Sequence, residues 1–269
     1  MDIIVLIGFA AAVLIGVSLG LIGGGGSILT VPVLVYILDV DPVLATAYSL
    51  FVVGTTSLVG AGNFMKQGKV DYKTAVVFAI PSFVAVFLTR KFLVPWLPDP
   101  LFSVGEFAIT KNIGIMVFFA LIMLAASYSM IKDNNKKLKE EGEVQVKFNI
   151  PMIALEGSVV GVITGIVGAG GGFLIIPALV LLAKLPMKMA VGTSLLIIAA
   201  KSLIGFLGDL GNQTIDWQML LIFTGLSVVG IFIGSALSKK INEKALKTGF
   251  GWFVLIMGVY IIGKELMAL

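Results

Sequence analysis

Long apolar runs recur along the whole chain, and they constrain its fold more than any other feature. Residues 113–131 and 217–237, for example, carry almost no polar residues at helical spacing. A helix of about 20 such residues is long enough to cross a hydrocarbon core about 30 Å thick. A soluble protein would need a polar face on most of its helices, yet only 13% of the 269 residues are charged. The sequence therefore predicts an all-α, polytopic membrane protein.

A glycine-rich motif interrupts the apolar runs twice. GLIGGGGSILTVP begins at Gly20 and GIVGAGGGFLIIP begins at Gly165, an offset of 165 − 20 = 145 residues. The same register continues well beyond the motifs, so that Asp71 meets Asp216. Self-similarity of this kind indicates an internal repeat. The predicted organisation is a single transmembrane transport domain over 1–269, made of a first repeat over 1–131, a charged cytoplasmic linker over 132–149 and a second repeat over 150–269.

About ten helical segments, five in each repeat, account for the apolar runs. They are expected at residues 3–22, 27–38, 43–65, 74–94, 112–131, 150–167, 172–184, 187–207, 217–237 and 248–262. The second segment of each repeat reaches only about 18 to 20 Å at about 1.5 Å per residue, so it is expected to begin inside the membrane. Near the end of the repeats the offset falls to 134, which places an insertion of 145 − 134 = 11 residues within 92–110.

Lysine and arginine are distributed unevenly over the predicted loops. If all ten segments cross the membrane, 14 of the 19 cations lie on one side, four lie on the other, and Lys201 lies within a segment. Arg90 is assigned to the sparsely charged side. Because short cytoplasmic loops are enriched in Lys and Arg, both termini are expected outside the cytoplasm of a multi-pass cell-membrane protein. Five segments per repeat make the repeats inverted; eight crossings with two re-entrant segments, the alternative, would make them parallel.

The glycine-rich breaks are candidate ligand-binding elements. The short helix after each break would present unpaired amides at membrane depth, which favours an anion. Ser27 is expected to cap the first of these helices. Close helix packing is the alternative role of the glycines, and it is favoured for Gly16 and Gly20. The candidate substrate-binding residues in the breaks are Gly24, Gly25, Gly26, Ser27, Gly170, Gly171 and Gly172.

Lys201 lies near the centre of an apolar segment. A lysine at such a position costs about 2.5 to 3.5 kcal/mol on insertion, so it usually has a partner. We expect an anionic substrate to be that partner, with the hydroxyl groups of Thr56 and Ser194 as further donors. A structural ion pair with Glu156 is the alternative, and the hydroxyl groups can instead bond to carbonyls of their own helices. Glu156 is also a candidate coupling residue.

The chain contains no cysteine and no histidine. A transition-metal site and a histidine proton relay are therefore not expected, and no cofactor is predicted. The net charge of +4 is attributed to membrane topology rather than to nucleic acid. No catalytic pairing with a defensible spacing occurs, so an enzyme is not expected. The expected partners are a small anionic substrate and the lipid bilayer, and a homodimer is left open.

The two glycine-rich motifs, their equivalent places in the two halves and the segment AGNFMKQGKVD resemble the sulfite exporter TauE/SafE family, over nearly the whole chain. This resemblance implies transport, usually export, of small sulfur-containing or carboxylate anions such as sulfite and sulfoacetate. Inverted repeats with interrupted helices favour a secondary transporter that works by alternating access. An anion channel and a transporter of small carboxylates are the alternatives.

Overall fold

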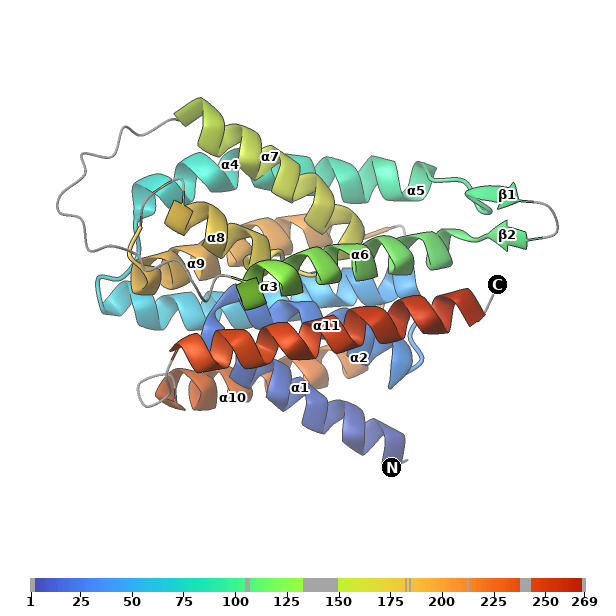
Figure 1. Ribbon diagram of the computed structural model, residues 1–269, viewed down its shortest axis with the longest axis horizontal. Helices are drawn as coiled ribbons and strands as arrows, with labels where there is room; N and C mark the ends of the chain where they lie inside the picture. The colour runs from blue at the N-terminus through green and yellow to red at the C-terminus, as the bar shows by residue number, and fades with distance from the viewer. Residues whose placement is uncertain are drawn as a thin grey trace.

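A computed structural model describes residues 3–104, 107–132, 150–181, 183, 185–211, 213–237 and 243–267. The long helices run side by side along the longest axis of the molecule (Figure 1). The first half contains α1 (Ile3–Ile22), α2 (Thr30–Tyr36), α3 (Pro42–Lys66), α4 (Tyr72–Leu88) and α6 (Lys111–Lys132). The second half contains α7 (Ile150–Val167), α8 (Gly172–Leu181), α9 (Met187–Leu207), α10 (Trp217–Leu237) and α11 (Glu243–Met267). Each of the ten predicted segments overlaps one of these helices. The predicted linker, 132–149, lies outside the described residues except for Lys132.

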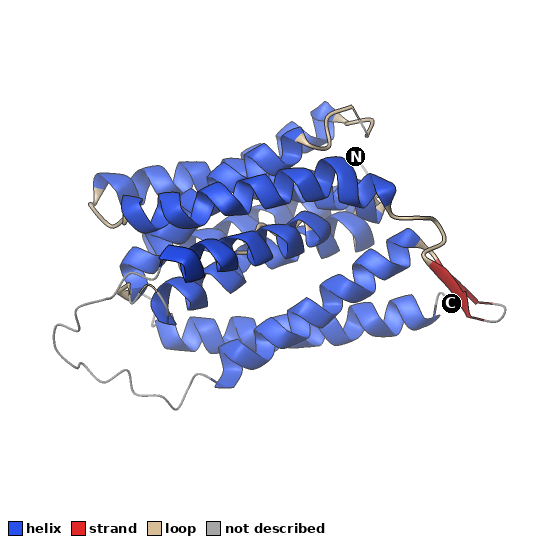
Figure 2. Ribbon diagram, turned by 90° about the horizontal axis from the view of Figure 1, so that it is seen from above, coloured by secondary structure: helices blue, strands red, loops and turns tan. Residues whose placement is uncertain are grey.

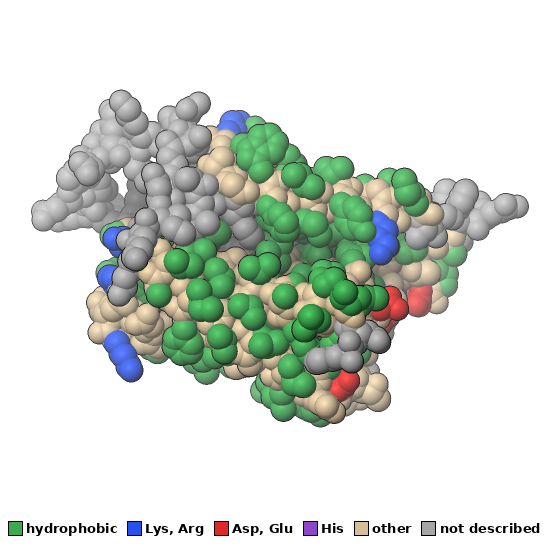
Figure 3. All heavy atoms as spheres, turned by 90° about the horizontal axis from the view of Figure 1, so that it is seen from below, with side chains coloured by type: hydrophobic (Ala, Val, Ile, Leu, Met, Phe, Trp, Pro, Cys, Tyr) green, Lys and Arg blue, Asp and Glu red, His purple; other side chains and the backbone are tan. Residues whose placement is uncertain are grey.

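Seven helices in the described part of the chain are long and apolar enough to cross a membrane. One of them runs from Tyr72 to Trp96, because α4 continues through a π-helical turn, η2 (Thr89–Leu93), into the short α5 (Val94–Trp96). Hydrophobic side chains cover most of the face seen in Figure 3, with most visible Lys and Arg side chains at one end and the acidic ones at the other. The prediction of an all-α protein with several membrane-spanning helices is thus confirmed.

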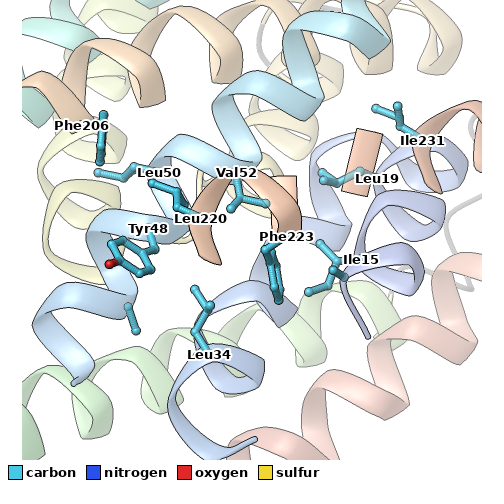
Figure 4. Packing of buried hydrophobic residues seen from close by; sticks show 12 residues of the cluster. Ile15, Leu19, Leu34, Tyr48, Leu50, Val52, Phe206, Leu220, Phe223 and Ile231 are labelled. Atoms are coloured by element: carbon cyan, nitrogen blue, oxygen red, sulfur yellow. The ribbon is translucent and has the colours of Figure 1, made fainter. Parts of the chain in front are cut away.

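Helices α3 and α9 lie together at the centre, and the pairs α1–α10 and α4–α7 pack against them. Helices α6 and α11 form a third pair. Seen from above, the helices lie side by side, with the two strands at one end (Figure 2). Side chains of α1, α2, α3, α9 and α10 form one hydrophobic core (Figure 4). Its largest buried members include Tyr48 and Phe223. The central α3 and α9 are the most deeply enclosed spanning helices, so polar groups on them are shielded from lipid.

Small residues allow the flanking pairs to approach closely. A methyl group at Gly16 of α1 would overlap the carbonyl oxygen of Ser227 on α10. A methyl group at Gly161 of α7 would overlap the carbonyl oxygen of Ser82 on α4. Gly20 likewise faces the backbone of α10, as the packing role favoured for Gly16 and Gly20 requires.

Two aspartates begin α4 and α10 in the same way. The Asp71 carboxylate accepts a hydrogen bond from the backbone N–H three residues on, and so does the Asp216 carboxylate. The backbone N–H of Asp71 donates to Thr193 Oγ1 at 2.9 Å, and that of Asp216 donates to Tyr48 Oη at 2.6 Å. Each helix start is therefore tied to the central helix of the other half of the chain.

A short β-hairpin follows α5. Its strands, β1 (Phe102–Val104) and β2 (Phe107–Ile109), pair in antiparallel register with Phe102 opposite Ile109. The hairpin lies in the segment where the repeat offset predicts an insertion, but its strands were not predicted. Three-residue strands carry too little alternation to be seen in a sequence.

Candidate functional site

The two glycine-rich breaks meet inside the protein. The first forms a 3-10 helix, η1 (Gly24–Leu29), between α1 and α2, and the second connects α7 to α8. Gly23 and Gly168 both have positive φ, 75° and 73°, a conformation that glycine adopts without strain. A methyl group at Gly24 would overlap the Cα of Gly172, and one at Gly172 would overlap the Cα of Gly24. The backbones of the two breaks are thus in direct contact.

Gly24 and Gly172 are the first residues of η1 and α8, where the backbone amides of a helix precede its first hydrogen-bonded turn. Unpaired amides at membrane depth are costly unless a ligand or water accepts from them. Gly26 and Gly170 also belong to the breaks, and the side chain of Ser27 lies against Gly170. The structure therefore brings Gly24 and Ser27 of the first break against Gly172 and Gly170 of the second, whereas Gly26 packs against α1.

The predicted capping role of Ser27 is wrong. Ser27 lies within η1, and its Oγ donates to the carbonyl oxygen of Gly24 at 2.7 Å. Helix α2 begins three residues later, at Thr30, and its cap residue Leu29 makes no side-chain hydrogen bond. The hydroxyl of Ser27 satisfies a carbonyl of the tight 3-10 turn, a competing local bond that short polar side chains readily make.

Lys201 of α9 lies beside the second break. Its side chain is 1% exposed, and its Nζ donates to Thr164 Oγ1 of α7 at 3.0 Å. The same Nζ lies 2.8 Å from the position that a Cβ on Gly171 would occupy. No carboxylate among the described residues lies within ion-pair distance of Lys201, and the alternative of a pair with Glu156 is not formed. Within the described part of the chain, this buried cation next to glycine backbone thus has one neutral hydrogen-bond partner.

Several buried hydroxyl groups on the central helices have no partner within the described part of the chain. They belong to Ser49, Thr56 and Ser57 of α3 and to Ser202 of α9. Ser194 differs, because its Oγ donates to the carbonyl oxygen of Val191 on its own helix at 2.8 Å. Thr56 is therefore free to donate to a ligand, whereas the hydroxyl of Ser194 already has an acceptor.

Arg90 is a second buried cation, and its assignment to an outer loop is wrong. It is 0% exposed, and its Nε donates to Asp209 Oδ2 at 2.8 Å. Its Nη1 donates to Thr46 Oγ1 at 2.8 Å and to the carbonyl oxygen of Gly165 at 3.2 Å. Burial raises the pKa of Asp209, and the Arg90 guanidinium opposes that rise. One signal was available in the sequence: Arg90 is the single arginine among 19 cations, and arginine suits buried ion pairs better than lysine.

Comparisons with known proteins give the family of the chain. The sequence pattern of the family described as "Sulfite exporter TauE/SafE" matches residues 8–261. A "probable membrane transporter protein" of Xylella fastidiosa (strain Temecula1) is 27% identical over 94% of this chain and 92% of its own length. The "probable membrane transporter protein YunE" of Bacillus subtilis is 27% identical over 94% of each chain. The "probable membrane transporter protein MJ0441" of Methanocaldococcus jannaschii is 25% identical over 97% of this chain and 95% of its own.

No solved structure matches the chain. The match to the family pattern covers both glycine-rich breaks, the central helices α3 and α9 and Lys201. The names of the relatives are those of membrane transporters rather than enzymes. The chain belongs to the sulfite exporter TauE/SafE family.

Proposed function

We propose that this protein is a secondary transporter that exports sulfite, or organosulfonates such as sulfoacetate, by alternating access. The observation that carries the proposal is Lys201, a fully buried lysine in a central helix without an acidic partner among the described residues. An ionisable side chain at membrane depth is expensive and usually marks a substrate or ion pathway. A small anion bound against Lys201 would supply the missing negative charge. The choice of a sulfur-containing anion rests on the family to which the chain belongs.

Buried donor groups on the central helices and at the breaks suit an oxyanion. Thr56 and Ser202 carry buried hydroxyl groups that no described residue engages, and Gly24 and Gly172 are the first residues of η1 and α8. An anion with several oxygens can accept hydrogen bonds from donors on different sides at once. Gly171, next to Lys201 Nζ, leaves room that any side chain would fill. Hydroxyl groups, amides and one ammonium would together replace the hydration shell of the anion.

Alternating access requires two halves that can rock against each other, and we propose that these are inverted five-segment repeats. Contacts that recur at an offset of 145 support this proposal. Gly16 meets Ser227 as Gly161 meets Ser82, and Asp71 bonds to α9 as Asp216 bonds to α3. The start of α1 and the end of α11 lie toward the same end of the bundle, as an even number of crossings requires (Figure 1). In this arrangement the two breaks enter the binding region from opposite sides.

Binding of the anion is tested by the thermal stability of the purified protein in detergent. We expect sulfite or sulfoacetate to raise the melting temperature progressively with concentration, because a ligand that binds only the native state stabilises it by mass action. Sulfate, taurine and simple carboxylates serve as comparison ligands at equal ionic strength. A panel in which no sulfur oxyanion shifts the melting temperature would contradict the proposal, and a shift with carboxylates alone would identify the protein as a carboxylate transporter.

A further inference from the structure

Arg90 connects four separate parts of the chain through one side chain. The guanidinium bonds to Asp209 after α9, to Thr46 of α3 and to the carbonyl oxygen of Gly165 on α7, while Arg90 itself lies in the turn η2 that continues α4. It is the largest fully buried side chain among the described residues. A charged side chain is costly to bury in a membrane protein. The hydrogen bonds that Arg90 makes are therefore expected to have a role in the protein.

These links cross the boundary between two groups of helices. Arg90 and Gly165 belong to α4 with its η2 extension and to α7, which pack along each other. Thr46 belongs to the central α3 and Asp209 follows the end of α9, and α3 and α9 also pack along each other. The bond to Gly165 stays within the outer pair, whereas the bonds to Thr46 and Asp209 hold that pair against the centre. A movement that separates the two groups at this end must break both of these bonds.

We propose that the Arg90–Asp209 pair is a latch that holds the α4–α7 pair against α3 and α9 and keeps this end of the molecule closed. The inference rests on the proposed alternating access, because a gate is needed only where access alternates. The latch joins the two halves but has no repeat-related counterpart: the positions equivalent to Arg90 and Asp209 at an offset of 145 are Ser235 and Phe64, which cannot form an ion pair. The two ends of the transporter are therefore held closed by different chemistry.

The local structure of η2 agrees with a gating role. Five residues, Thr89–Leu93, form a π-helical turn within an otherwise α-helical segment. Such turns occur often at functional sites, because they redirect one side chain at a cost in helix stability. Here the turn directs Arg90 into the protein, while its neighbour Lys91 is exposed.

A single cysteine reports opening at this end, since the chain has none of its own. Val94 is buried in a cluster with Val43 and Ile115, next to the latch. We expect Val94→Cys to react slowly with a membrane-impermeant methanethiosulfonate reagent. Asp209→Asn, added to that protein, should speed the reaction about tenfold or more, the scale of losing a charge-assisted hydrogen bond. Thr46→Val, which leaves the ion pair in place, should give a smaller increase.

Two controls separate opening from loss of structure. Met123 is buried between α6 and α11, away from the latch, and Met123→Cys should react at the same slow rate with and without Asp209→Asn. Should Asp209→Asn fail to fold, Thr46→Val provides the test. An unchanged rate at Val94→Cys, or an equal increase at both reporter positions, would overturn the latch.

The anion-dependent melting temperature, measured on the same proteins, distinguishes failure of the latch from failure of the proposed function. A normal shift with an unchanged rate at Val94→Cys rejects the latch alone. A faster reaction at Val94→Cys in a protein that no anion stabilises rejects the proposed transport and, with it, the gating role of the latch.

Discussion

Lys201→Met is expected to reduce sharply the stabilising effect of the anion and to raise the stability of the protein without ligand. The substitution removes the one buried ammonium that lacks an acidic partner among the described residues, while methionine fills a similar volume. A hydrogen bond to a charged group contributes about 1.5 to 3 kcal/mol, so the anion should bind about 10- to 100-fold more weakly. Removal of an uncompensated buried charge should at the same time raise the melting temperature of the unliganded protein.

Lys188→Met is the matched control, because Lys188 lies on the same helix but is exposed. It should leave both the anion shift and the exchange of labelled sulfite in proteoliposomes unchanged. If Lys201→Met retains the full anion-induced shift, Lys201 is not the counter-charge of the anion.

Gly16→Ala and Gly161→Ala should each destabilise the protein by about 1 to 3 kcal/mol, the usual cost of overpacking. A methyl group at either position overlaps a backbone carbonyl oxygen of the neighbouring helix, and backbone moves less readily than a side chain. The effects should be similar, since the two contacts are equivalent at an offset of 145. The free energy of unfolding, measured by equilibrium denaturation in mixed micelles, checks the expectation.

Gly225→Ala on α10 is the comparison for these variants, because a methyl group there meets nothing within 4 Å. It should be neutral or stabilise the helix by about 0.5 to 1 kcal/mol through reduced backbone entropy. If Gly16→Ala and Gly225→Ala are equally stable, the packing of α1 on α10 does not depend on the close approach of their backbones at Gly16.

The positions of the helices were predictable because membrane helices are apolar over their whole length and loops are not. Helices α1, α7, α9 and α10 begin and end at the predicted residues. Local backbone geometry was not predictable in the same way. A run of glycines is compatible with several turns, so the sequence did not indicate that Ser27 would lie inside a 3-10 helix.

The candidate site could be predicted where it depended on a single costly residue. Lys201 is conspicuous because lysine in an apolar segment has a high insertion cost, and the structure buries it next to Gly171. Arg90 was missed because it stands beside Lys91 near the end of an apolar run, where cations ordinarily face water. The turn η2 and the ion pair with the distant Asp209 place Arg90 inside the protein. Neither the turn nor the ion pair can be predicted from the local sequence.

The central claim is that an anion binds where two inverted repeats meet, and the sidedness of two equivalent loops tests it most directly. Gln67 follows α3 and Gln213 follows α9, at nearly equivalent places in the two halves. Single cysteines at these positions, probed from each side of the membrane with an impermeant reagent, should react from opposite sides, with Gln67→Cys facing the cytoplasm. Reaction of both from the same side would contradict inverted repeats and favour two parallel halves with re-entrant segments.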